Sequence, residues 1–396
     1  MGRFNRGLTP WRYGSPVISI PKEPRRLRMP DPLSQPTRFA RWPGWACGLA
    51  LLAFALLVAC GVARPVPPQL MAERPITGIA GSETPPDAAG DDVALYRAMA
   101  QKVRGGEDYY AAATRLLRDN DYPLRPFVAV RLPTLTYMLA ALPPGLAIVP
   151  MCLLIAAVIL AWTVRLAPAL RTPEICSWAS LLVMMNCLTA FSPALVVFHE
   201  SWAALLIALS LALYRHERWW PSVLLALLAV MIRELALPYV LLMGALALLE
   251  RRWREAAAWA GVTIAFLAAL GLHAQAVWAV TSAADPASPG WSASGGWPFV
   301  VAAIQKATLF NHLPFAVTPL LVPLALLGWT AWASPTGTRA ALFLAGFSGA
   351  MMLFGRPDNF YWAVMFTPIL LVGLIFAPAA LRDLARPLVF GAQRAT

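Results

Sequence analysis

The chain has 396 residues, of which 59% are hydrophobic and 13% are charged, whereas an ordinary soluble domain carries about 25% charged residues. Apolar stretches of about 20 residues, the length that crosses roughly 30 Å of hydrocarbon, recur from Trp45 to the C-terminus. This composition excludes an ordinary soluble domain. Arginines in the short joints between apolar stretches explain the net charge of +12, so we expect no nucleic-acid partner.

The residues before the first apolar stretch are rich in Arg and Pro, and Glu23 and Asp31 are their acidic residues. We predict a disordered, basic cytoplasmic tail over residues 1–44, a polytopic membrane domain over residues 45–380 and a cytoplasmic tail over residues 381–396. The predicted fold class is an all-α membrane protein with about ten transmembrane helices (9–11). The predicted spans are 45–63, 145–164, 177–197, 201–214, 222–236, 239–249, 256–276, 314–333, 340–355 and 360–380.

With a cytoplasmic N-terminus, every joint on the cytoplasmic side contains arginine, as the positive-inside rule requires. This pattern predicts a multi-pass protein of a bacterial-type inner membrane whose two termini both lie in the cytoplasm. The arginines are Arg165, Arg171, Arg215, Arg218, Arg251, Arg252, Arg254, Arg339, Arg382, Arg386 and Arg394.

Residues 126–142 are apolar enough to be a span but contain Arg131 and Pro133. Counting them as a full span would move the arginines at 251–254 to the outside, so we interpret the segment as interfacial or re-entrant. Residues 64–142 then form one large extracytoplasmic loop with juxtamembrane helices at 92–103 and 108–118. The apolar face of the first helix favours a position along the membrane surface.

The first candidate constellation lies on this loop and combines carboxylates with tyrosines. Adjacent carboxylates at a helix start can act as a general base, as a ligand pair for a divalent metal, or simply as a helix cap. All three alternatives stay open from the residues alone. The constellation consists of Asp91, Asp92, Tyr96, Glu107, Tyr109 and Tyr110.

Ionisable residues within apolar helices are costly, so they indicate functional sites by default. Arg233 and Glu234 fall in such a run at the outer end of a predicted span, and Glu200 follows His199 at another outer junction. The alternative for Arg233 and Glu234 is a mutual ion pair that fixes the helix turn. His273 lies near the outer end of a third span, where an interfacial role is the simpler interpretation.

A further constellation, GRPDNFYW, places Arg356 and Asn359 in an external turn beside aromatic residues. An arginine at a membrane surface can bind a lipid phosphate through its planar donor fork, and Arg125 and Arg131 allow the same interpretation. The topology was inferred from cytoplasmic arginines alone, yet it places all these constellations on one side of the membrane. That convergence predicts an extracytoplasmic site.

These motifs together resemble the integral-membrane glycosyltransferases of the GT-C fold, a mannosyltransferase-like superfamily. The resemblance covers about residues 45–385 and is carried by Asp92-x-x-x-Tyr96, Gly106-Glu107-x-Tyr109-Tyr110, Arg125-Pro126 and the segments HESWA, RELALPYVLL and GRPDNFYW. It implies transfer of a sugar from a polyprenyl-phosphate-linked donor.

For the site, the resemblance implies Asp92 as general base with Asp91 as neighbour or alternative, and Arg233 and Arg356 as ligands of the donor phosphate. Some members use a divalent metal, for which Asp91, Asp92 and Glu107 would supply oxygen ligands; the residues themselves do not establish one. The expected partners are a lipid-linked sugar donor, membrane lipids and an acceptor that is a glycan, lipid or protein. The rival hypothesis is a transporter or lipid flippase without transferase activity.

Overall fold

A computed structural model describes residues 33–63, 92–188, 195–290 and 293–392. These residues are helical and form no strand, apart from two isolated bridges that join Leu33 to Leu170 and Arg125 to Ala287. Most of the predicted N-terminal tail, the first part of the predicted external loop and Asp91 lie outside the described residues.

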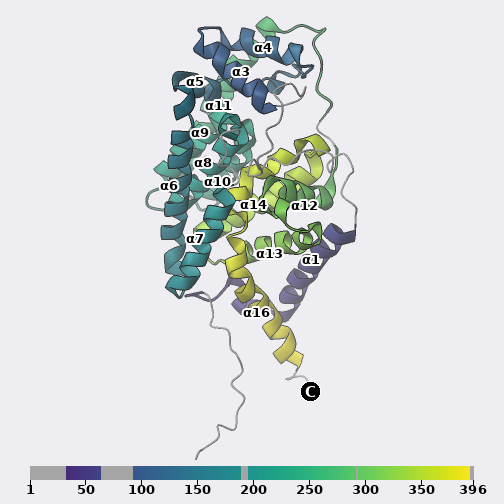
Figure 1. The fold of residues 1–396 in the computed structure, drawn as a ribbon. Coiled ribbons are helices and arrows are strands. Elements are labelled where there is room, and N and C mark those ends of the chain that lie inside the picture. Colours follow the sequence, from purple (N-terminus) through teal and green to yellow (C-terminus); the bar gives the residue numbers. More distant parts are fainter. Residues whose placement is uncertain (1–32, 64–91, 189–194, 291–292, 393–396) are drawn as a thin grey trace, which may run out of the picture. The chain divides into compact units, whose positions relative to one another are not determined.

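The helices follow one another with short connections (Figure 1). The α-helices are α1 (Gly44–Ala63), α3 (Asp92–Arg104), α4 (Tyr109–Asp119), α5 (Thr134–Ala141), α6 (Ile148–Leu166), α7 (Pro173–Leu188), α8 (His199–Leu213), α9 (Trp220–Ile232), α10 (Leu237–Leu249), α11 (Trp253–Val280), α12 (Gly296–Ala307), α13 (Thr318–Ala331), α14 (Pro335–Phe354), α15 (Thr367–Leu370) and α16 (Gly373–Ala392). Short 3-10 helices join them, among them η1 (Arg38–Arg41), η2 (Phe127–Ala129), η4 (Ala167–Ala169), η5 (Leu195–Val197), η6 (Glu234–Ala236) and η9 (Pro357–Phe366).

Several of these helices are long and apolar enough to cross a membrane, so the chain is a helical membrane protein. Four qualify by length and composition, namely Gly44–Ala63, Pro144–Ala169, Trp253–Val280 and Pro335–Phe354. A fifth is the pair Pro357–Leu370 and Gly373–Val389, which is bent by 74°. Four or five spans are thus supported among the described residues, and the finer expectation of about ten remains a prediction.

Shorter apolar helices occupy most of the other predicted spans. The first of the shorter apolar helices, Phe127–Ala141, lies in the segment interpreted as interfacial or re-entrant, and the others, His199–Leu213, Trp220–Ile232, Glu234–Leu249 and Phe315–Ala331, occupy predicted spans. Within the first of them, α5 has 8 residues and is therefore only about 12 Å long, too short to cross a bilayer by itself. At the C-terminus, α16 continues past residue 380, where we had placed the last boundary.

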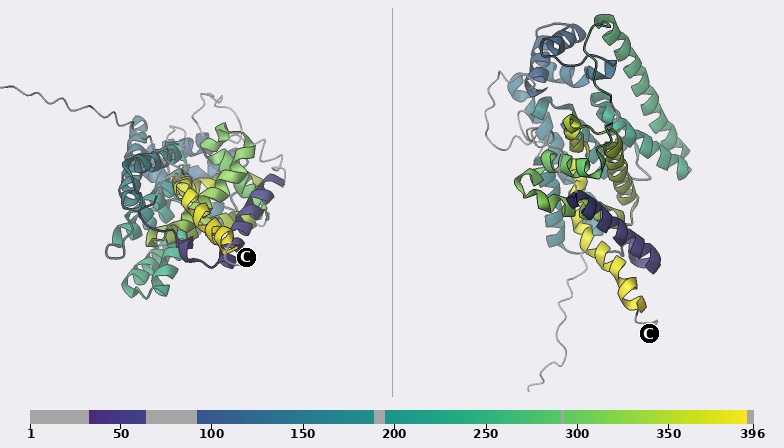
Figure 2. Two further views of the ribbon diagram at one scale, coloured as in Figure 1. Left: turned by 90° about the horizontal axis from the view of Figure 1, so that it is seen from below. Right: turned by 90° about the vertical axis from the view of Figure 1, so that its right-hand side faces the viewer.

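The closest helix packing joins α13 to α16 (Figures 1 and 2). A Cβ atom added to Gly328 would lie 1.8 Å from the Gly373 carbonyl oxygen, so only glycine allows the two backbones to approach this closely. Trp332 of the α13 end stacks on Phe376 of α16 with ring centroids 5.2 Å apart. α1 packs along α16 and α13 beside this contact.

Helices α3 and α4 lie together at one end of the bundle (Figure 1). Their apolar side chains form a small core of their own, in which Leu95, Met99, Tyr109 and Leu117 surround Val277 from the end of α11. The expectation that the apolar face of α3 rests on the membrane is therefore replaced by a protein contact. This packing attaches the charged start of α3 to the ends of the long helices.

Candidate functional site

The centre of the candidate site is a buried ion pair between α8 and the end of α9. Arg233 has extended backbone (φ −145°, ψ 116°) and ends α9 directly before η6. Its Nε lies 2.5 Å from Glu200 Oε1 of α8, and both side chains are 2% exposed. This contact is an ion pair without hydrogen-bond geometry, since neither atom has a hydrogen-bond partner. Arg233 also donates to the Glu234 carboxylate, which begins η6.

Arg131 extends this network towards α3. Its guanidinium lies 3.7 Å from Glu234 Oε1, and its Nε donates a hydrogen bond to Tyr96 Oη at 3.2 Å. The backbone of Arg131 is held in turn by Tyr109, whose hydroxyl donates to the Arg131 carbonyl at 2.6 Å. Two arginines and two glutamates, from three segments that are far apart in the sequence, therefore form one continuous network in which the formal charges cancel.

α3 supplies the carboxylate nearest to this network. Tyr96 lies one helical turn after Asp92, and its ring meets the His199 ring edge to face, with centroids 5.0 Å apart. Burial raises the pKa of Tyr96 above its usual value, which the Arg131 charge opposes and the Asp92 and Glu200 charges reinforce. The Asp92 carboxylate accepts a hydrogen bond from Tyr122 at 2.6 Å. The charge of Asp92 thus acts on Tyr96, which connects α3 to the network.

Several buried polar atoms around the network have no hydrogen-bond partner. They include both ring nitrogens of His199, Ser201 Oγ and Asn359 Oδ1. Such atoms normally bind protein groups, water or a ligand, because leaving them unpaired costs roughly 1–3 kcal/mol each. Asn359 comes from η9, where its Nδ2 donates to Tyr361 Oη at 3.4 Å. The buried surroundings of the network therefore contain polar groups whose hydrogen-bonding capacity is unused.

Other predicted site residues lie in separate interactions. Glu107 forms an ion pair with Arg115 at 2.7 Å, Arg125 donates to the Asp285 carbonyl at 2.8 Å, and Tyr110 Oη lies 3.2 Å from His273 Nδ1. Arg356 pairs with Asp358.

Arg356 also donates to the Pro289 carbonyl at 2.5 Å, and its hydrogen bond with Asp358 raises its pKa further. Glu107 and Arg356 are thus paired with Arg115 and Asp358, and not with Arg233 or Glu234. What the structure gathers is Tyr96, Arg131, Glu200, Arg233 and Glu234, with Asp92 beside them.

A metal site finds no further support in the described part of the chain, where no group of three or more His, Cys, Asp or Glu residues could hold an ion. Asp91, the predicted partner of Asp92 in such a site, lies outside the described residues. The contact of Asp92 with the Tyr122 hydroxyl suits a carboxylate that accepts protons from hydroxyl groups.

The sequence did not reveal two contacts, that of Tyr122 with Asp92 and that of Arg118 with Asp285. Tyr122 was not singled out, although an aromatic hydroxyl shortly after two helices on the same loop is a natural partner for a helix-start carboxylate. The pairing of Arg118 with Asp285 at 2.6 Å joins α4 to the loop after α11. These residues are far apart in the sequence, so no local pattern could have predicted their contact.

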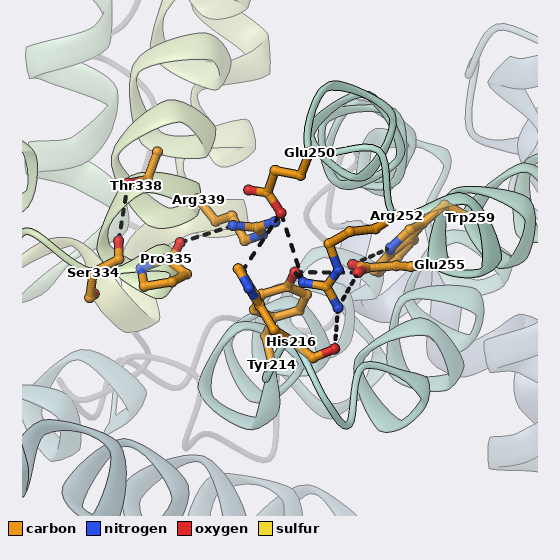
Figure 3. Close-up of polar contacts among 10 residues, drawn as sticks. All are labelled: Tyr214, His216, Glu250, Arg252, Glu255, Trp259, Ser334, Pro335, Thr338 and Arg339. Carbon is orange, nitrogen blue, oxygen red and sulfur yellow. Dashed lines mark hydrogen bonds and ion pairs between the residues drawn. The ribbon is translucent and has the colours of Figure 1, made fainter.

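A second ionic cluster lies where α10 ends and α11 begins, at the opposite end of the long helices, and Figure 3 shows its contacts. Arg339 of α14 donates to Glu250 at 2.8 Å, and its guanidinium lies 4.2 Å from the centre of the Tyr214 ring. Arg252 pairs with Glu255 at 2.7 Å. The arginines predicted to be cytoplasmic thus meet carboxylates at the end of the bundle that is remote from Asp92.

Comparison of the chain with protein-family models, with curated proteins and with solved structures found no match.

Proposed function

We propose that this chain is a membrane glycosyltransferase, which transfers a sugar from a polyprenyl-phosphate-linked donor to an acceptor at the extracytoplasmic face. The observation that supports it most is the juxtaposition of α3 with the helix ends: Tyr96, one turn from Asp92, hydrogen-bonds to Arg131 of the buried ionic network. A carboxylate and a fixed guanidinium are thereby brought to one end of a membrane bundle.

In the proposed reaction, an acceptor hydroxyl attacks the anomeric carbon of the donor while its proton passes to Asp92. The bond between the anomeric carbon and the phosphate oxygen breaks, and its electron pair leaves on the polyprenyl phosphate. A single acting carboxylate implies inversion at the anomeric carbon. General-base catalysis of this kind contributes about 10²–10⁴-fold in rate.

Within this proposal the arginines have different roles. Arg131, whose side chain is 16% exposed, is placed to meet the developing charge on the donor phosphate. Arg233, between Glu200 and Glu234 and only 2% exposed, acts as a positioning residue that orients Glu234 and through it Arg131. Arg356, already paired with Asp358, has a smaller share in donor binding than the sequence resemblance implied. No step in this mechanism requires a metal.

The direct test replaces Asp92 by Asn in the full-length chain. Purified variant and wild type are assayed for transfer of a radiolabelled sugar from a panel of polyprenyl-phosphate-linked donors to membrane-derived acceptors. We expect the variant to lose at least about 100-fold in rate, with its melting temperature little changed. Asp119→Asn is the matched control, because Asp119 is exposed at the end of α4. Full transfer by Asp92→Asn would refute the assignment of the base.

The second candidate function is transport. It is favoured by the position of Glu200 and Arg233 at the ends of apolar helices, beside unpartnered His199, since ionisable groups in membranes often line transport paths. Reconstituted proteoliposomes separate the two functions. Movement of a lipid-linked sugar across the bilayer without formation of a new glycosidic bond would replace the transferase proposal.

A further inference from the structure

A cavity of about 440 Å³ lies at the other end of the bundle, and its size falls within the about 300–1,000 Å³ typical of small-molecule sites. Its walls come from the segment before η1 and from the ends of α6, α8, α13 and α14. α8 contributes His199 to the candidate site, and Tyr214, directly after its C-terminal end, lines the cavity. The 15 residues of α8 separate the two places by about 20 Å.

Positive charge predominates in the lining. Arg165 and Arg215 face Glu217, the single acidic residue among the described residues that line the cavity. Arg165 is fixed in place because it donates to the carbonyls of Ala212 at 2.7 Å and of Tyr214 at 2.5 Å. The exposed Arg215 side chain, in contrast, makes no hydrogen bond or ion pair within the described part of the chain. The cavity thus has one preorganised guanidinium and one that is free to bind a ligand.

The start of α14 adds a second positive element to the same cavity. Ser334, Pro335 and Thr336 line it, and Ser334 caps the 20-residue helix by accepting a hydrogen bond from the Gly337 N–H at 2.9 Å. The first turn of a long helix carries a partial positive charge that favours anions. Pro335 has no N–H and the Gly337 N–H is bound to Ser334, so this contribution comes from the helix dipole and not from these two donors. The partial positive charge at the start of α14 and the charges of the two arginines all favour binding of an anion.

Large aromatic side chains mark the depth of the cavity in the membrane. Trp332 lines it, and Trp220 and Trp253 begin α9 and α11 close to His216, with exposed fractions of 52% and 66%. Arg252, directly before Trp253, donates to the His216 carbonyl. Exposed tryptophans at the ends of apolar helices are typical of the lipid headgroup level. This pattern predicts that the cavity lies at the height of lipid phosphates.

We propose that this cavity binds the phosphate group of an anionic ligand, with Arg215 as the direct contact and Arg165 and the α14 N-terminus as supporting positive charge. The chemistry recognised is a phosphate that retains at least one negative charge. Its position at the headgroup level makes a membrane phospholipid the expected source, and a soluble phosphate compound is the other source with the same chemistry. Basic pockets between membrane helices bind anionic headgroups in this way.

The test measures ligand-dependent melting of the full-length protein in detergent. Phosphatidylglycerol, phosphatidylcholine and inorganic phosphate are titrated separately. We expect phosphatidylglycerol to raise the melting temperature of the wild type, and Arg215→Ala to raise the half-maximal lipid concentration at least fivefold. Arg215→Gln, with a longer polar side chain, should behave like Arg215→Ala.

The matched control is Arg218→Ala, which removes the same charge from the same loop. Arg218 lies outside the cavity lining, over the Trp220 ring at 5.4 Å, so its loss should leave the lipid response within about twofold of wild type. Equal loss in Arg215→Ala and Arg218→Ala, or equal stabilisation by phosphatidylglycerol and phosphatidylcholine, would overturn the proposal. Stabilisation by inorganic phosphate that is abolished in Arg215→Ala would support the site and identify a soluble compound as the ligand.

Discussion

Two arginines at opposite ends of the bundle, Arg233 and Arg339, are both almost completely buried and both face glutamate. Their surroundings differ. Glu200, the partner of Arg233, is as buried as the arginine itself, whereas Glu250, the partner of Arg339, is 33% exposed. Tyr214 also covers Arg339 with its ring. The charge of Arg233 is thus neutralised by a buried carboxylate, and the charge of Arg339 by a carboxylate that is partly exposed to solvent.

The neighbours of the two arginines differ as well. Among the ten residues drawn in Figure 3, a buried side-chain atom without a hydrogen-bond partner occurs only in Arg339 itself, at Nε. Around Arg233, both nitrogens of His199 and the Ser201 hydroxyl are unpartnered. A cluster whose neighbouring groups are all paired serves the fold, and a cluster surrounded by unpartnered donors and acceptors is suited to bind another molecule. We infer that the Arg339 cluster contributes mainly to stability and that the Arg233 cluster suits the proposed reaction site.

Removing each arginine should give the largest contrast. Arg233→Ala leaves Glu200 as a buried carboxylate without a counter-charge and should cost roughly 3–5 kcal/mol. Arg339→Ala leaves a carboxylate that water can reach and should cost about 1–3 kcal/mol. Denaturant titration of both variants in detergent measures the difference. The double variant Arg233→Ala/Glu200→Gln should recover part of the loss, and failure to recover would show that packing, not charge, dominates at Arg233.

A smaller effect is expected from removing single polar groups. Trp259 Nε1 donates to the buried Glu255 carboxylate at 3.2 Å, so Trp259→Phe should lower stability by about 1–3 kcal/mol. His199→Phe removes nitrogens that have no partner and should leave stability unchanged or raise it, while sugar transfer falls at least tenfold. Melting and transfer assays are run on both variants. A clear loss of stability in His199→Phe would contradict the proposed difference between the paired groups around Arg339 and the unpartnered groups around Arg233.

The smallest predicted effect is a loss of stability at low pH. A hydrogen bond from Arg118 holds the pKa of Asp285 below its usual value, so the stabilisation is present above the unfolded pKa of about 3.9 and is lost as the pH falls below it. Asp285→Asn should therefore melt at a lower temperature than wild type at pH 7. This gap should narrow below about pH 4; a gap that is constant from pH 7 to pH 3 would contradict the ion pair.

Local chemistry explains what could be predicted from the sequence. Asp108 caps α4 by accepting the Ala111 N–H, and the two glycines before it separate α3 from α4 within a residue of the predicted bounds. The pairing of Arg233 with Glu234, left open as an alternative to function, is present because adjacent side chains at a helix end can reach each other. Helix bounds and neighbouring contacts depend on a few consecutive residues.

Contacts between distant segments could not be predicted in the same way. Glu200 reaches Arg233 only because α8 packs against α9, and Arg356 is held by Asp358 and Pro289 instead of facing the network. The apolar face of α3 gave no indication whether lipid or protein would cover it. α12 escaped prediction because it directly follows a Ser- and Gly-rich stretch and has only 12 residues.

The break between α15 and α16 has a mechanical consequence. Trp329 of α13 donates its Nε1 hydrogen to the carbonyls of Ile369 and Leu370, at 3.0 and 3.2 Å, so the backbone freed by the 74° bend is bonded inside the protein. With the Gly328–Gly373 contact beside it, this bend is a rigid corner and not a hinge. Any widening of the bundle to admit a long lipid chain is therefore expected from other helices, such as α11, which packs mainly against α9 and α10.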